Sequence, residues 1–182
     1  MANHSETESA RMFFALWPDG KTRRALDQAA GKAGRQCGGR RTRSETIHMT
    51  LVFLGEAPLA RLEQLRETAA GIVLPGFSVP INRMGWWRHN RIVWAGTDAA
   101  PELLSELAGA LRKKLTAAGF GFDAKTFVPH VTLLRKAHCP DREFPPLAVE
   151  WKAEDFVLVR SVLSAEGAAY EIVGRWELLK DK

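Results

Sequence analysis

Two short strings of sequence decide the fold, His48-Met49-Thr50-Leu51 and His130-Val131-Thr132-Leu133. Both lie in apolar stretches and place a histidine two residues before a threonine, which is the period of a β-strand. The first string predicts a strand with its histidine and threonine on one face and four apolar side chains on the other: Ile47, Met49, Leu51 and Phe53. Two such strands beside a shared cleft would bring together two imidazoles and two hydroxyls. That set can hold a phosphate and move protons on either side of it.

The alternative is a structural role, in which each strand histidine is buried and hydrogen-bonded to its neighbouring threonine. A single copy of the pattern would favour that role. Two copies count against it, because burying two polar pairs is costly unless each is fully hydrogen-bonded. We therefore expect His48 and His130 to act together on a phosphate ester.

The composition sets limits on the class of protein. A chain of 182 residues suits one domain or two small lobes. Its 26 Lys and Arg against 21 Asp and Glu permit an anionic partner such as nucleic acid without requiring one. Cys37 and Cys139 lie in no metal-binding or redox spacing, so we expect a reduced, cytoplasmic protein. The apolar run 12–17 is too short for a signal-peptide core or a membrane span, and residues 1–10 are expected to be a disordered tail.

Strands and helices are expected to alternate along the rest of the chain. The predicted strands are 11–17, 46–54, 77–84, 91–96, 127–135, 155–163 and 169–179, and the predicted helices are 21–32, 58–72 and 101–118. The segments 77–84 and 91–96 are expected to pair as a hairpin. Each string follows a helix and a loop, which favours two similar lobes that each contribute one histidine strand to a cleft between them.

Five segments share their sequence pattern and their order with a known superfamily: 11–16, 47–55, 91–96, 127–135 and 170–178. The fourth includes Pro129 before the histidine and Arg135 after it. The chain resembles the two-histidine (2H) phosphoesterases, and within them the bacterial and archaeal RNA 2′,3′-cyclic phosphodiesterases once called 2′-5′ RNA ligases. Met49 stands where leucine is usual, and the loop 40–43 is more basic than expected. The resemblance implies an α+β fold for 11–182: a single bilobal domain with two mainly antiparallel sheets, helices outside, a pseudo-two-fold axis and the active-site cleft between the lobes.

The resemblance also implies roles for the site residues. His48 would be the proton donor that protonates the 3′ oxygen, and His130 the proton acceptor that activates water, leaving a 2′-phosphate. The residues alone leave this polarity open, because the two motifs are nearly interchangeable. Thr50 and Thr132 would bind phosphate oxygens through their hydroxyls, and Arg135 would bind them through the planar fork of its guanidinium. The alternative for Arg135 is a solvent-exposed cation at the end of a strand. Neither motif contains a carboxylate, and we expect no metal and no cofactor.

The expected partners are RNA with 2′,3′-cyclic phosphate ends or cyclic nucleotides, bound by a monomer away from membranes. Arg40, Arg41 and Arg43 are candidate contacts to an RNA backbone, or residues of a solvated loop. Trp86 and Trp87 are candidate base-stacking residues, or packing residues of a hairpin. Joining RNA ends through a 2′-5′ linkage or hydrolysing a cyclic phosphate of ADP-ribose would use the same site. A module that binds RNA ends without turnover is the alternative from another class.

Overall fold

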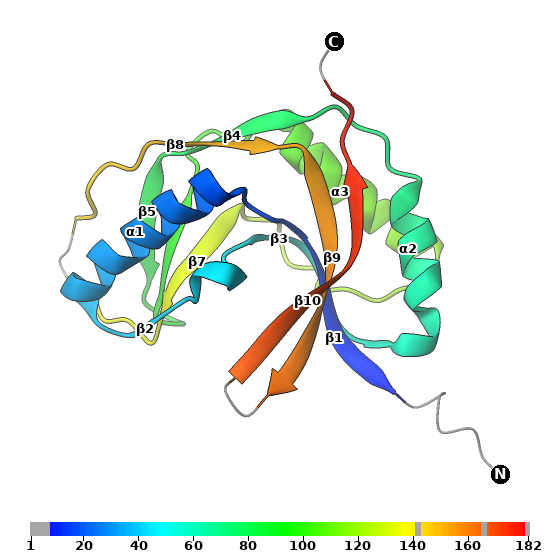
Figure 1. Ribbon diagram of the computed structural model, residues 1–182, viewed down its shortest axis with the longest axis horizontal. Helices are drawn as coiled ribbons and strands as arrows, with labels where there is room; N and C mark the ends of the chain where they lie inside the picture. Colours follow the sequence, from blue (N-terminus) through cyan, green and yellow to red (C-terminus); the bar gives the residue numbers. More distant parts are fainter. Residues whose placement is uncertain (1–7, 141–142, 165–166, 181–182) are drawn as a thin grey trace.

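Eight strands form one long antiparallel sheet in the computed structural model, which describes residues 8–140, 143–164 and 167–180 (Figure 1). The strands are β1 (Ser9–Leu16), β2 (Arg40–Arg41), β3 (Met49–Pro58), β5 (Arg83–Trp87), β6 (Ile92–Gly96), β7 (His130–Arg135), β9 (Asp155–Ser164) and β10 (Gly167–Glu177). Their order is β10-β9-β1-β3-β7-β6-β5, and β2 lies beside β7. We expected the segment that holds β2 to be a loop.

A second sheet pairs β4 (Phe77–Ile81) with β8 (Val149–Ala153). The expected hairpin is therefore wrong in part, because β5 pairs with β6 while β4 leaves for the second sheet. The chain changes direction at Asn82, whose backbone N–H donates to Gly96 and whose side-chain amide donates to Asp98. The described part also holds α1 (Gly20–Cys37), α2 (Leu62–Ala70) and α3 (Glu102–Ala117). The expected α+β class with two antiparallel sheets is confirmed.

The long sheet consists of two halves that are joined where β3 meets β7. One half contains β10, β9, β1 and β3, and the other contains β7, β6, β5 and β2. The residue pair that joins them is Met49 with Val131. Each half thus supplies one of the two histidine strands, as the bilobal interpretation predicts.

The helices pack on one face of the long sheet. Helix α1 lies against β7, and α3 lies against β3. Helix α1 begins after Asp19, whose carboxylate accepts the Thr22 N–H at 2.7 Å, and it ends at Cys37, later than expected. Its last turn packs closely on β7, since a Cβ on Gly34 would lie in van der Waals contact with Leu134, 3.6 Å away. The helices and this face of the sheet share one buried core, which leaves the opposite face for the functional side chains.

The beginning of the chain differs in part from the expected tail. Strand β1 starts at Ser9, so residues 9 and 10 belong to the sheet, and residues 1–7 lie outside the described part. Among the described residues, no helix has the length and apolar character that crossing a bilayer needs.

A disulfide joins Cys37, the last residue of α1, to Cys139 in the loop after β7. The expectation that both cysteines are reduced is therefore wrong for this structure. The two residues are 102 positions apart, and only the packing of α1 on β7 brings them together. Beside the disulfide, the His138 N–H donates to the Cys37 carbonyl at 3.0 Å.

Candidate active site

The pairing of Met49 with Val131 sets the geometry of the two histidine motifs. Both side chains are fully buried on the core face of the sheet. Since neighbouring residues in a strand point to opposite faces, the histidine and threonine on either side of each point to the other face. Continuing the antiparallel register places Thr132 across from His48 and His130 across from Thr50. The histidine of each motif therefore lies opposite the threonine of the other, on either side of the pair Met49 and Val131.

All five residues expected to act on phosphate line one cleft of about 620 Å³. The volume is in the range of sites that hold small-molecule ligands. The cleft is lined by Arg11, Phe13, Arg40, Arg41, Thr42, Arg43, Thr46, His48, Thr50, Phe53, Ile92, His130, Thr132, Arg135, Ser161 and Tyr170. Among the described residues, this lining contains five arginines and no carboxylate. The cleft is therefore suited to an anion.

Arg135 reaches the cleft because β7 contains a bulge. Opposite β6, Trp94 pairs with Thr132 and Val93 pairs with Leu134, so Leu133 is an extra residue. In a regular strand, a residue three positions after Thr132 would point to the core. The bulge reverses the alternation after Leu133, both Leu133 and Leu134 are buried, and Arg135 lines the cleft.

Phe53 reaches the cleft through a matching bulge in β3. Opposite β1, Ala15 pairs with Thr50 and Phe14 pairs with Val52, which makes Leu51 the extra residue. We expected Phe53 on the core face with Met49 and Leu51, and this is wrong, because it lines the cleft. Phe53 comes three residues after the threonine of the first motif, and Arg135 comes three residues after the threonine of the second. The two motifs therefore place an aromatic ring and a guanidinium at equivalent positions.

Hydrogen bonds to backbone carbonyls orient both imidazoles. The Nδ1 of His48 lies 2.7 Å from the Thr46 carbonyl, and the Nδ1 of His130 lies 2.8 Å from the Val128 carbonyl. Because a carbonyl only accepts, Nδ1 carries the proton in the neutral ring, and Nε2 is left with a lone pair. The Nε2 of His48 lies 3.1 Å from the Thr50 hydroxyl, which can donate to it. Nε2 is therefore the ring nitrogen that is left available for a proton exchange with a ligand.

Burial lowers the pKa of both histidines. The pKa of His48 falls from 6.5 to about 4, first because burial penalises the charged ring and then because Arg135 and His130 repel it. The Thr46 carbonyl opposes this change. Burial, with a smaller effect of Arg135, also lowers the pKa of His130. Both rings are mainly neutral at pH 7 in the empty cleft, and a bound anion would favour their protonated forms.

Aromatic rings from outside the motifs surround His48. The Trp17 ring is stacked on the imidazole, with centroids 5.5 Å apart and planes 9° apart. Phe13 lies 4.8 Å from the imidazole, and Tyr170 meets it edge-on at 5.5 Å. The sequence analysis missed these neighbours. Alternation along the first strand puts Phe13, Ala15 and Trp17 on one face, a signal that could have been used.

The two tryptophans of the β5–β6 hairpin lie in different surroundings. Trp87 meets the His130 ring at 4.7 Å and 72°, next to the cleft. Trp86 packs against the main core and meets His138 edge-on at 5.7 Å. Trp87 therefore lies against a motif histidine although it is not among the cleft-lining residues, whereas Trp86 packs the hairpin against the protein.

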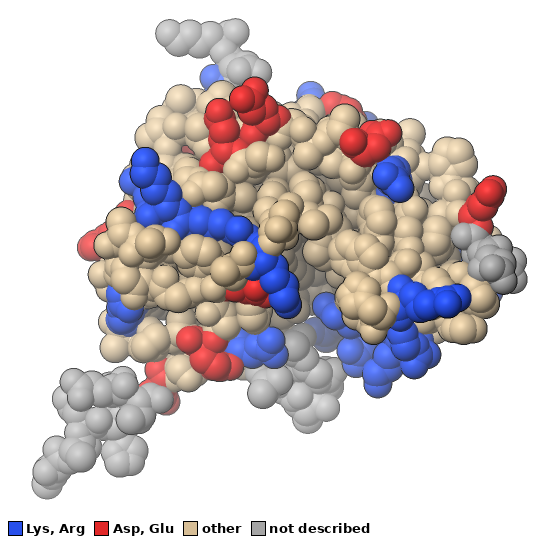
Figure 2. Space-filling view, turned by 180° about the vertical axis from the view of Figure 1, so that it is seen from behind, with Lys and Arg blue, Asp and Glu red and all other residues tan. Residues whose placement is uncertain are grey.

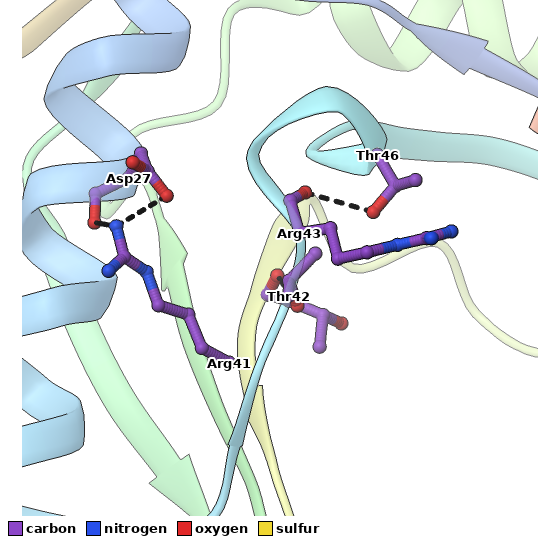
Figure 3. Close-up of polar contacts among 6 residues, drawn as sticks. Asp27, Arg41, Thr42, Arg43 and Thr46 are labelled. Carbon is purple, nitrogen blue, oxygen red and sulfur yellow. Dashed lines mark hydrogen bonds and ion pairs between the residues drawn. The ribbon is translucent and has the colours of Figure 1, made fainter. Parts of the chain in front are cut away.

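The basic segment 40–43 lies along β7 beside the motif strand. Thr42 holds it there, because its backbone N–H donates to Leu133 and its hydroxyl donates to Thr132, both at 2.9 Å. Figure 3 shows Arg41 and Arg43 extending in opposite directions from this segment. Arg41 pairs with Asp27 of α1 at 2.5 Å, while Arg43 lies 3.5 Å from Glu45. Figure 2 shows Lys and Arg gathered at the end of the molecule where β2 and the β5–β6 turn lie.

Comparison with known proteins gives consistent results. A family model described as "LigT like Phosphoesterase" matches residues 16–94 and 96–170, and each matched segment contains one histidine motif. An RNA 2′,3′-cyclic phosphodiesterase of Escherichia coli is 30% identical over 174 residues, covering 94% of this chain and 98% of its own. One of Thermus thermophilus is 29% identical over 185 residues, covering 92% of this chain and 90% of its own.

The fold of a solved relative is also similar. The crystal structure of E. coli LigT in its apo form matches with a TM-score of 0.85 and 30% identity, covering 94% of this chain and 99% of that one. The resemblance noted in the sequence is therefore confirmed. The chain belongs to the LigT-like phosphoesterase family of the two-histidine superfamily.

Proposed function

We propose that the chain is an enzyme that hydrolyses a 2′,3′-cyclic phosphate, at the end of an RNA or on a nucleotide, to a 2′-phosphate. The observation that carries the proposal is the convergence of two histidines, two threonines and Arg135 on one carboxylate-free cleft in the described residues. The relatives named RNA 2′,3′-cyclic phosphodiesterases support this choice of substrate.

The proposed reaction uses one imidazole on each side of phosphorus. The Nε2 of His130 takes a proton from water, whose oxygen forms a bond to phosphorus. The bond from phosphorus to the 3′ oxygen breaks, and that oxygen takes a proton from Nε2 of His48. The products are a 2′-phosphomonoester and a free 3′ hydroxyl. Positioned proton transfer of this kind typically contributes about 10²- to 10⁴-fold to the rate.

The remaining side chains would stabilise the charge that develops on phosphate. Thr50 and Thr132 each offer a hydroxyl donor to a non-bridging oxygen, and Arg135 offers a fork of N–H donors. His48 needs a proton to act as the acid, and its pKa in the empty cleft is lowered to about 4. A bound phosphate opposes that effect by its negative charge, and the stacked Trp17 ring favours a cation over its face.

Metal independence is part of the proposal. The cleft lining in the described residues offers imidazole, hydroxyl and guanidinium groups, and guanidinium repels a cation. Among the described residues, no group of three or more His, Cys, Asp or Glu is arranged to hold a metal ion. We expect proton transfer and arginine to supply the stabilisation that a metal would otherwise provide. RNA ends as partners complete the proposal. The cytoplasmic location expected from reduced cysteines loses that support, because Cys37 and Cys139 form a disulfide.

Phosphorus NMR of adenosine 2′,3′-cyclic phosphate mixed with the protein tests the proposal. We expect the cyclic phosphate signal to convert into that of the 2′-phosphate, at the same rate with EDTA. Formation of the 3′-phosphate would contradict departure of the 3′ oxygen. Loss of turnover on chelation would contradict metal independence. Binding without product over a long incubation would favour a module that only captures RNA ends.

A further inference from the structure

The cleft carries more positive charge than a single cyclic phosphate uses. A cyclic phosphodiester has one negative charge, and the two threonines with Arg135 provide its donors. Four more arginines line the cleft: Arg11, Arg40, Arg41 and Arg43. All five arginines are exposed, and gathering so much charge of one sign around one anion is unfavourable unless the other arginines have roles of their own.

Three of these four arginines have contacts within the protein. Arg41 donates to the Asp27 carbonyl at 2.7 Å as well as pairing with its carboxylate, and its guanidinium crosses Gly31, where a Cβ would lie 3.3 Å away. It therefore ties the segment 40–43 to α1. Arg43 lies near Glu45. Arg11 lies over the Phe53 ring at 5.3 Å and pairs in register with Glu56 of β3.

Arg40 has a different neighbour, because it is paired directly with Arg135. The register of β2 and β7 places Arg40 opposite Arg135 and Arg41 opposite Leu134. Opposed residues share a face, so Arg40 is on the cleft side with Arg135. Arg41 also lines the cleft, but its guanidinium reaches Asp27 of α1. Like charges directly opposite each other destabilise a pair of strands. Both side chains are exposed, and an anion between or beside them would remove this repulsion.

The backbone keeps the two arginines together. Gly38 and Gly39 precede Arg40 with φ values of 60° and 85°, which other residues adopt at a cost. A Cβ on Gly39 would lie 2.6 Å from the Arg135 carbonyl, so only glycine allows this approach. The Thr42 hydrogen bonds to β7 fix the other end of the segment. The structure thus holds Arg40 and Arg135 at directly opposed strand positions, which a flexible loop would not do.

We propose that Arg40 binds a second phosphate of the substrate, the phosphodiester on the 5′ side of the nucleotide that carries the cyclic phosphate. The inference rests on the proposed function and makes it more specific. A mononucleotide lacks this phosphate, whereas every RNA end has it. Arg40 is then a residue that favours RNA ends over cyclic mononucleotides. The gathering of Lys and Arg in Figure 2 lies at the same end of the protein, where an RNA chain would continue.

The test compares two substrates: adenosine 2′,3′-cyclic phosphate and the dinucleotide ApA ending in a 2′,3′-cyclic phosphate. The wild type and Arg40→Gln are measured, with Arg35→Gln as the matched control, because Arg35 is an exposed arginine of the last turn of α1 outside the cleft lining. We expect Arg40→Gln to lower kcat/KM on the dinucleotide about tenfold more than on the mononucleotide. Arg35→Gln should lower both equally or not at all.

Two further measurements isolate the charge of the second phosphate. In the wild type, the slope of log kcat/KM against log salt should be steeper by about 0.7 for the dinucleotide, and Arg40→Gln should abolish the difference. A dinucleotide with a neutral methylphosphonate linkage keeps the second base, and on it the variant and the wild type should differ no more than on the mononucleotide.

The outcomes separate this inference from the proposed function. Equal losses on both substrates would overturn the inference and place Arg40 at the cyclic phosphate. No loss on either substrate would also overturn it. If the wild type turns over neither substrate, the proposed function fails. In that case, calorimetry measures the affinity for 2′-AMP and for ApA 2′-phosphate in the wild type and in Arg40→Gln. If the substitution weakens both affinities equally, a second phosphate site is refuted.

Discussion

The low pKa of His48 predicts how the stability of the protein depends on pH. The unfolded chain has a histidine pKa of about 6.5, whereas burial in the cleft lowers the pKa of His48 to about 4. Between these values the unfolded state binds more protons than the folded state. The free energy of unfolding therefore falls as the pH falls from about 6.5 to 4. The difference between the two pKa values corresponds to about 3 kcal/mol.

Urea unfolding between pH 7 and pH 4 measures this effect in the wild type and in His48→Gln. Other groups also titrate in this range, and comparison of the two proteins cancels their contributions. We expect the wild type to lose about 3 kcal/mol more than the variant over this range. Proton NMR should show that the His48 pKa is low in the empty protein and rises when inorganic phosphate is added. Parallel stability curves, or a His48 pKa near 6.5, would refute the argument that burial keeps the ring neutral.

Three further substitutions test other parts of the site and fold. Arg135→Lys should lower kcat/KM at least tenfold, because an ammonium lacks the planar fork of donors that suits phosphate. Arg88→Lys, in the exposed hairpin turn, is the control and should leave kcat/KM unchanged in steady-state kinetics. Trp17→Leu should lower the pKa of His48 in the phosphate complex and reduce kcat, since it removes the ring stacked on the imidazole; an unchanged NMR titration would contradict that role. Cys37→Ser should cost about 4 to 5 kcal/mol of unfolding free energy, because the disulfide joins residues 102 positions apart. Cys139→Ser should cost the same, and an unchanged denaturation midpoint in either would show that the cross-link adds no stability.

The period-two pattern made the histidine strands predictable from sequence. Alternating apolar and polar residues gave both strands, and the order of the other elements gave the α+β class. The pairing of Met49 with Val131 did not follow from sequence, because a contact between distant strands has no local signal. The same reason hid the disulfide and the second sheet.

The bulges explain why part of the site was misplaced. Strict alternation puts Phe53 on the core face and gives no reason for Arg135 to face the cleft. One extra residue in each strand, Leu51 and Leu133, reverses the alternation after the threonine. A bulge depends on the register with the neighbouring strand, so the residues of one strand do not reveal it. The role of Trp17 has no local signal either, because its contact with the His48 ring joins parts of the chain that are distant in sequence.

The central claim is that His48 and His130 act together on one phosphate, and the kinetics of their variants test it most directly. Values of kcat/KM on adenosine 2′,3′-cyclic phosphate should be measured for His48→Ala, His130→Ala and the double variant, with His89→Ala, an exposed hairpin histidine, as the control. We expect each single variant to lose about 10²- to 10⁴-fold, and the double variant to lose less than the product of the two, because the residues act as a unit. Near-wild-type activity in a folded His48→Ala or His130→Ala protein would contradict the claim.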